Sequence, residues 1–131
     1  MVMVVALDKP SDRTERILKF ALEEAKLRNE KILFVHSLFG GDKTTEKEVK
    51  AGEELLEDAA KKAEAAGVEY ETHLLVRGKN PGDDIVDFAK EVQASVVVIG
   101  VRKRRPAGKL LFGSVAQHVI LHAEQPVICI K

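Results

Sequence analysis

The sequence predicts a single α/β domain, spanning residues 1–131, in which helices cover both faces of a doubly wound and mostly parallel open sheet. Five apolar runs rich in Val, Ile and Leu alternate with four segments of helical periodicity. That alternation is typical of parallel sheets with crossover helices. Two of the runs are apolar throughout, as expected of strands that are buried on both faces. A chain of 131 residues is also long enough to bury a core of its own.

The charge balance excludes a general attraction to polyanions. Lys and Arg total 21 and Asp and Glu total 21, so the formal net charge is zero. No global field therefore draws the chain to nucleic acid or to an acidic membrane, and any anion site must be local. No apolar stretch approaches the roughly 18 residues that span a bilayer. The single cysteine, Cys129, has no partner for an internal disulfide, and the N-terminal residues lack a secretory signal pattern, so we expect a cytoplasmic protein.

The N-terminal third contains a strand, a helix and a second strand. The first strand is Val2–Leu7, and Asp12 is expected to cap the following helix, with Glu15 completing a capping box. One face of this helix carries the apolar residues Ile17, Leu18, Ala21, Leu22 and Ala25. The second strand is expected at Ile32–His36, where His36 is interpreted as a packed or hydrogen-bonded histidine rather than a catalytic base.

The middle of the chain begins with a loop at residues 39–44. Thr45 and Glu48 form a second capping box, and the helix that they open buries Leu55, Leu56, Ala59 and Ala63. Gly67 is expected to end this helix in the left-handed conformation. The segment Val68–Val76 then alternates apolar and mainly polar residues, which predicts an edge strand with one buried face.

A third helix is expected after Asn80 as its cap, with Pro81 at its first position. Its buried residues are expected to be Ile85, Phe88, Ala89 and Val92. An acidic cluster near its start consists of Asp83, Asp84 and Asp87, and interaction with the positive end of the helix dipole explains most of it.

The last part of the chain contains two more strands and one helix. The fourth strand, Val96–Ile99, is apolar throughout, and Gly113-Ser114 opens the last helix. The fifth strand is Pro126–Ile130, where we expect Cys129 to be a small buried thiol rather than a nucleophile. The last helix carries two histidines four residues apart, His118 and His122. Because no third ligand is evident, they are interpreted as ordinary histidines rather than as a metal site.

A ligand crevice is expected beyond the carboxyl ends of the two central strands, where the strand order of a doubly wound sheet reverses. Asp8 follows the first of these strands, and Gly100 follows the other. The segment after Gly100 is a basic loop with five cations within eight residues: Arg102, Lys103, Arg104, Arg105 and Lys109. Free N–H groups at Gly113-Ser114 and the Ser114 hydroxyl form a phosphate cradle in this interpretation. In the alternative, the cations are solvated loop charges and Gly113-Ser114 is only a good helix start.

The spacing of this loop resembles that of a known family. It resembles the universal stress protein motif of a glycine, a second glycine after two residues, and a glycine with Ser or Thr after nine more. In this sequence the three positions are occupied by Gly100, Lys103 and Gly113-Ser114, so Lys103 stands at the second glycine position. The resemblance continues along the chain at residues 4–8 with Ser11, 35–36, 77–81, 97–100 and 126–128. It implies an adenine nucleotide alpha hydrolase-like fold with strand order 3-2-1-4-5, numbered along the chain.

The resemblance also implies a function and a site. The chain is expected to bind ATP, with AMP or ADP as alternatives and Mg²⁺ as a companion ion, and to act in stress response or regulation with at most slow hydrolysis. The implied binding residues are Asp8, Ser37, Gly100, Arg102, Lys103, Gly113, Ser114 and Val115. Lys103 leaves two alternatives open, since its ammonium can pair with a phosphate or its Cβ can narrow the crevice.

The expected strand order leaves the fifth strand, residues 127–130, at an edge of the sheet. An apolar edge invites pairing, so we expect an isologous homodimer through this strand. The alternative function is a nucleotide-free interaction protein of the same fold.

Overall fold

The computed structural model describes residues 1–102 and 112–131. In these residues a five-stranded parallel sheet has the order β3-β2-β1-β4-β5, as predicted. The elements in chain order are β1 (Val2–Ala6), α1 (Asp12–Arg28), β2 (Lys31–Leu38), the 3-10 turn η1 (Gly41–Lys43), α2 (Glu46–Ala66), β3 (Tyr70–Val76), α3 (Pro81–Glu91), β4 (Val96–Gly100), α4 (Ser114–His122) and β5 (Val127–Ile130).

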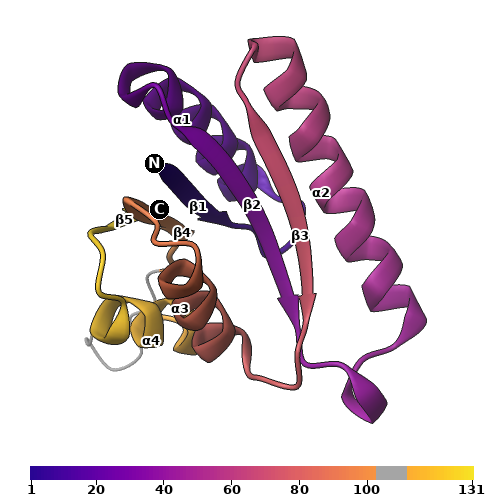
Figure 1. Cartoon of the computed structure of the whole chain (residues 1–131). Coiled ribbons are helices and arrows are strands. Elements are labelled where there is room, and N and C mark those ends of the chain that lie inside the picture. The colour runs from indigo at the N-terminus through magenta and orange to yellow at the C-terminus, as the bar shows by residue number, and fades with distance from the viewer. Residues whose placement is uncertain (103–111) are drawn as a thin grey trace.

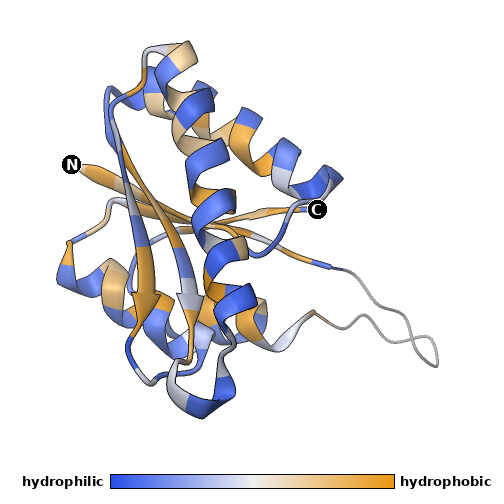
Figure 2. Ribbon diagram, turned by 90° about the vertical axis from the view of Figure 1, so that its right-hand side faces the viewer, coloured by the Kyte–Doolittle hydropathy of each residue, from blue (hydrophilic) through white to orange (hydrophobic). Residues whose placement is uncertain are grey.

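The helices form two layers around the sheet. Figure 1 shows α1 and α2 on one side and α3 and α4 together on the other. Neighbouring residues of β1 point into opposite layers, since Met3 and Val5 pack with α1 and α2 whereas Val4 packs with α3 and α4. Figure 2 shows the resulting apolar colour along the central strands and hydrophilic residues on the outer helix surfaces. The central strands are therefore buried on both faces, which is why they read as continuous apolar runs.

The register brings the carboxyl ends of the strands to one edge of the sheet. Val4 of β1 lies beside Leu33 of β2 on one side and beside Val97 of β4 on the other. All pairings are parallel, so residues that follow β1, β2 and β4 emerge close together. The order reverses between β1 and β4, and this is the position where doubly wound sheets bind ligands.

The cap of α1 is one residue earlier than predicted. Ser11, not Asp12, is the N-cap, and its hydroxyl accepts a hydrogen bond from the Thr14 amide at 3.1 Å. Thr14 occupies the third helical position, so Glu15 completes no capping box; the Thr14 hydroxyl instead donates to the Lys9 carbonyl. Asp12 is the first helical residue, where its carboxylate interacts favourably with the helix dipole.

The ends of α2 are as predicted. The Thr45 hydroxyl accepts a hydrogen bond from the Glu48 amide, and the Glu48 carboxylate accepts one from the Thr45 amide. Gly67 ends the helix with a φ of 71°, in the region that glycine adopts without a Cβ penalty.

Burial differs from the prediction at four positions, in β3, at the end of α3 and in β5. Strand β3 lies at an edge as expected, yet Leu75 is buried against the α3 side while Val76 is 47% exposed. Val92 ends α3 and is only partly buried. Cys129 is exposed, because β5 is the other edge strand and its outer side has no neighbour among the described residues.

The described helices do not meet the requirements for a membrane span. None of them combines the length and the apolar composition needed to cross a bilayer.

Candidate functional site

The ends of β1 and β2 are joined by a histidine. The His36 Nδ1 lies 2.8 Å from the Leu7 carbonyl oxygen, which accepts the hydrogen bond, so His36 is a hydrogen-bonded histidine as predicted. On the other side of the ring, a Cβ built on Gly52 of α2 would lie 2.6 Å from His36 Cδ2. Gly52 therefore allows α2 to pass directly over the end of β2. Asp8 follows Leu7 and is exposed at this edge.

A cleft of about 370 Å³ lies between the first turns of α3 and α4. It is lined by Asn80, Pro81, Gly82, Asp83, Ser114, Val115 and His118. Its volume is within the range of small-molecule sites, roughly 300–1,000 Å³. Neither Asn80 nor Gly113, the two N-cap residues, makes a side-chain capping bond. The first-turn N–H groups of both helices are therefore without a side-chain capping acceptor, and they suit an anionic ligand.

A contact between a histidine and a carboxylate crosses this cleft. The His118 Nε2 lies 2.8 Å from the Asp83 carboxylate, and the His118 ring also lies 4.3 Å, centroid to centroid, from that of His122. A Cβ on Gly82 would lie 3.0 Å from the His118 Cβ, so glycine at this position lets α4 pack closely on α3. In the part of the chain that the structure describes, no group of three potential ligands could hold a metal ion.

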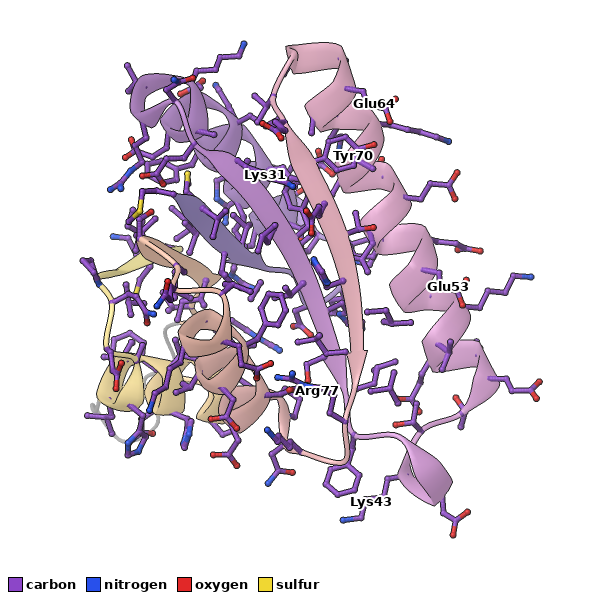
Figure 3. All side chains as sticks on the ribbon, viewed as in Figure 1. Lys31, Lys43, Glu53, Glu64, Tyr70 and Arg77 are labelled. Carbon is purple, nitrogen blue, oxygen red and sulfur yellow. The ribbon has the colours of Figure 1, made fainter. Side chains whose placement is uncertain are left out.

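Asp84, the carboxylate that follows Asp83 in α3, is fully buried. Asp84 is 0% exposed and accepts a hydrogen bond from the Ser37 hydroxyl at 2.6 Å. It also accepts one from the Arg77 Nε at 2.6 Å, and a further Arg77 nitrogen donates to the Glu91 carboxylate at 2.8 Å. Figure 3 shows Arg77 between the end of β3 and α3. Asp83 and Asp84 lie in the first turn, where the helix dipole favours them, and the structure adds specific partners for each carboxylate of the acidic cluster.

The charged side chains of this region perturb one another. The hydrogen bond to Glu91 is the largest cause of the raised pKa of Arg77, and the hydrogen bond to Asp84 also raises it. Partial burial acts in the opposite direction but is outweighed. Lys79 donates to Asp87 at 2.8 Å. This bond is the largest cause of the raised pKa of Lys79 and of the lowered pKa of Asp87. Arg77, Lys79 and Asp87 are therefore held in their charged forms at neutral pH.

The contact of Ser37 limits what its side chain can do. Ser37 is 8% exposed and faces α3, and its hydroxyl proton is committed to Asp84. A ligand that contacted this hydroxyl would compete with a charge-assisted hydrogen bond.

Gly100 faces the opposite layer from Ser37. A Cβ on Gly100 would lie 2.7 Å from Arg13 Cδ and 2.9 Å from Ile17 Cδ1, both on α1. The missing side chain at Gly100 thus makes room for α1 to pack on the end of β4. Arg102 follows and is exposed.

The structure groups the predicted site residues in two sets. Ser114 and Val115 line the cleft with the start of α3, next to Gly113, whereas Asp8, Ser37 and Gly100 lie at or just after the ends of three neighbouring strands and do not line it. Arg102 is the one cation of the basic loop within the described residues, and the remaining four lie outside them: Lys103, Arg104, Arg105 and Lys109.

Sequence reasoning missed the ion pair between the buried Asp84 and the partly exposed Arg77. A signal was present for Asp84, which stands four residues before Phe88 and beside Ile85, and so shares the buried face of α3. A charged residue on such a face requires a partner, and the sequence alone did not show which one.

The fold and the position of the cleft define a doubly wound α/β protein with a cleft at the carboxyl edge of its sheet. The chain belongs to the universal stress protein family, since the model of the Universal stress protein family matches residues 1–131. This confirms the resemblance in the sequence, and the fold is the adenine nucleotide alpha hydrolase-like fold that it implied.

Two relatives illustrate the similarity. A universal stress protein of Mycolicibacterium smegmatis is 31% identical over 114 residues, which are 87% of this chain and 85% of the relative. The solved structure of a universal stress protein from Archaeoglobus fulgidus is 57% identical, with a TM-score of 0.93, and the match covers 100% of this chain and 98% of that one.

Several solved relatives hold adenine nucleotides. The Archaeoglobus fulgidus universal stress protein in complex with dAMP is 53% identical, with a TM-score of 0.89 over 100% of this chain and 98% of that one. A universal stress protein in complex with cAMP is 25% identical, with a TM-score of 0.80 over 100% and 97% of the two chains. An Arabidopsis thaliana family member with AMP bound is 25% identical, with a TM-score of 0.72 over 100% and 91%.

Proposed function

We propose that this chain binds an adenine nucleotide at the carboxyl edge of its sheet and acts as a regulator in a stress response. The observation that carries the proposal is the dAMP complex of a relative that is 53% identical over the whole chain. The cleft between α3 and α4 supports it, because two helix starts without side-chain caps offer backbone donors to an anion.

The proposed binding residues act in two groups. Gly113, Ser114 and Val115 would hold phosphate oxygens with the N–H groups of the first turn of α4 and the Ser114 hydroxyl. Asp8 and Ser37, after β1 and near the end of β2, would face the nucleoside. Because the Ser37 hydroxyl is engaged with Asp84, its contact with a base is proposed to use the backbone. Gly100, Arg102 and Lys103 are proposed to contact the phosphates along the loop.

The number of phosphates is a separate proposal. The nucleotides named in the relatives' complexes are dAMP, AMP and cAMP, so a monophosphate is the first candidate. ATP with Mg²⁺ is the second candidate. It is supported by the five cations within eight residues in the basic loop after Gly100, whose charge matches that of a polyphosphate. Slow hydrolysis of that ATP would be at most an accessory activity.

We also propose a homodimer through β5. Its outer edge has no strand beside it in the described residues, and Cys129 is exposed there. Antiparallel pairing with the same strand of a second copy would satisfy the backbone groups of this edge and give an isologous interface. Light scattering that shows the mass of one chain at every concentration would contradict it.

Two further proposals rest on the sequence alone. The proposed compartment is the cytoplasm, and residues 1–131 are proposed to form one domain.

Acid extraction tests the nucleotide proposal at low cost. The purified chain is precipitated with acid, and the released small molecules are identified by mass. The proposal predicts AMP, dAMP or ATP in the extract, or an empty protein that takes up AMP on addition. An empty protein that takes up no adenine nucleotide would instead support the nucleotide-free interaction protein.

A further inference from the structure

Arg13, in the first turn of α1, has an unusual position for a charged residue. It stands four residues before Ile17 and eight before Ala21, so it continues the buried stripe of the helix rather than its solvent face. The stem of its side chain lies against the end of β4, because a Cβ on Gly100 would meet Arg13 Cδ at 2.7 Å and Arg13 Cγ at 3.4 Å. The residue as a whole is only partly exposed.

The guanidinium of Arg13 contains an unsatisfied donor. Its Nε is buried and has no hydrogen-bond partner among the residues that the structure describes. Other arginines of the described residues use the same atom, as in the bond from Arg16 Nε to the Lys131 carbonyl at 2.8 Å and the bond from Arg77 Nε to Asp84. A buried donor without an acceptor costs free energy, so such a group calls for an explanation.

The place of Arg13 suggests what the acceptor is. The stem of its side chain lies against Gly100 at the end of β4, and β4 neighbours β1 where the strand order reverses. Asp8 is the first carboxylate after β1, yet none of the ion pairs between described residues includes Arg13. A guanidinium that keeps its charge and lacks a carboxylate matches an anionic group that comes with a ligand.

We propose that Arg13 binds a phosphate group of the ligand at the switch point between β1 and β4. The inference rests on the proposed nucleotide function and adds a binding residue from α1, which the family resemblance did not implicate. It also gives Gly100 a second role, since any side chain there would displace the arginine from this position.

The direct test is NMR observation of the arginine Nε–Hε groups during titration with AMP, with adenosine as the ligand that lacks phosphate. The Arg13 resonance is assigned from its loss in Arg13→Lys, which keeps the aliphatic stem. We expect AMP to shift the Arg13 resonance and adenosine to leave it unchanged. Arg16, whose Nε already has an acceptor, provides the internal control and should not move with either ligand.

Calorimetry on matched variants gives the energetic counterpart. Arg13→Gln should weaken AMP binding by about tenfold, the scale of one charge-assisted contact, and change adenosine binding by less than about twofold. The control Arg16→Gln, on the same helix, should change neither. Circular dichroism confirms that each variant is folded.

The outcomes separate the two proposals. If wild type binds AMP while Arg13→Gln binds it equally well and the Arg13 resonance stays fixed, the inference is overturned and the nucleotide function survives. If wild type binds neither AMP nor adenosine, the nucleotide function fails, and pyrophosphate becomes the probe for Arg13. A shift of the Arg13 resonance with pyrophosphate then supports an anion site, and no shift overturns it.

Discussion

Ser37 on β2 and Asp84 on α3 are 47 residues apart in the chain and meet in a 2.6 Å hydrogen bond inside the protein. Asp84 also accepts from Arg77, which follows β3. The carboxylate thus links β2, the connection after β3 and the first turn of α3. Because that turn forms one wall of the cleft, the bond fixes the wall relative to the sheet.

Asp84→Asn is expected to lower the free energy of unfolding by about 2 kcal/mol, because hydrogen bonds to a charged acceptor are replaced by weaker ones. Urea denaturation measures the loss. The matched control is Asp83→Asn, whose carboxylate is 53% exposed and paired with His118. An exposed pair contributes less than about 1 kcal/mol, so equal losses for the two variants would contradict the buried network.

Gly52→Ala is expected to destabilise the protein even though alanine favours a helix. The added Cβ would lie 2.6 Å from His36 Cδ2 and 3.0 Å from Leu74 Cδ1. His36 cannot turn away without losing its bond to the Leu7 carbonyl, and overpacking of this kind costs about 1–3 kcal/mol.

The comparison variant for Gly52→Ala is Ala65→Gly at an exposed position of the same helix α2. That change should cost about 1 kcal/mol from helix propensity alone. If Gly52→Ala instead raised the free energy of unfolding by about 1 kcal/mol, which is the loss expected of the control with the opposite sign, α2 would not approach β2 as closely as described.

The thiol of Cys129 provides a pH-dependent prediction. Although Cys129 is an exposed residue, neighbouring atoms partly desolvate its sulfur, and this raises the pKa of the thiol above its ordinary value of 9.0. Because the thiolate is the reactive form, a raised pKa lowers its fraction at pH 8, and the folded chain should react with a disulfide reagent more slowly than the urea-unfolded chain. The difference should narrow as the pH rises above the folded pKa. Equal rates at pH 8 would contradict the partial burial of the sulfur.

Lys103 decides between the two nucleotide candidates. If its ammonium pairs with a phosphate, Lys103→Ala should weaken ATP binding by about 1–3 kcal/mol, as expected of a charge-assisted contact, and leave adenosine binding unchanged. Calorimetry with ATP–Mg²⁺ and, in a separate titration, with adenosine measures the two affinities. An increase of ATP affinity in Lys103→Gly would show instead that the lysine side chain narrows the crevice.

Most of the fold was predictable because its signals are local. The apolar runs predicted the central strands β1 and β4, and the Thr45 and Glu48 pair predicted the start of α2. The cap of α1 was misplaced by one residue because Ser11 and Asp12 are both good N-cap residues, and only the backbone conformation of Ser11 shows which one is used.

The site was less predictable because its contacts join distant segments. The resemblance identified Ser114 and Val115, which line the cleft. The bond between Ser37 and Asp84 and the contact between Arg13 and Gly100 depend on the packing of helices on the sheet, which the spacing of residues along the chain does not specify. The predicted burial of Cys129 was wrong for a related reason, since an apolar strand at a sheet edge has the same local pattern as a buried one.

The central claim is that the chain binds an adenine nucleotide at the carboxyl edge of its sheet, and calorimetric titration with AMP tests it most directly. The titration uses protein that acid extraction has shown to be free of nucleotide, with Gly113→Val as the site variant. A Cβ at Gly113 meets no atom of the described residues within 4 Å, so this variant should fold while its side chain obstructs the start of α4. We predict saturable binding of AMP by wild type and its loss in Gly113→Val. The absence of saturable heat with AMP and with ATP–Mg²⁺ up to millimolar concentration would contradict the account.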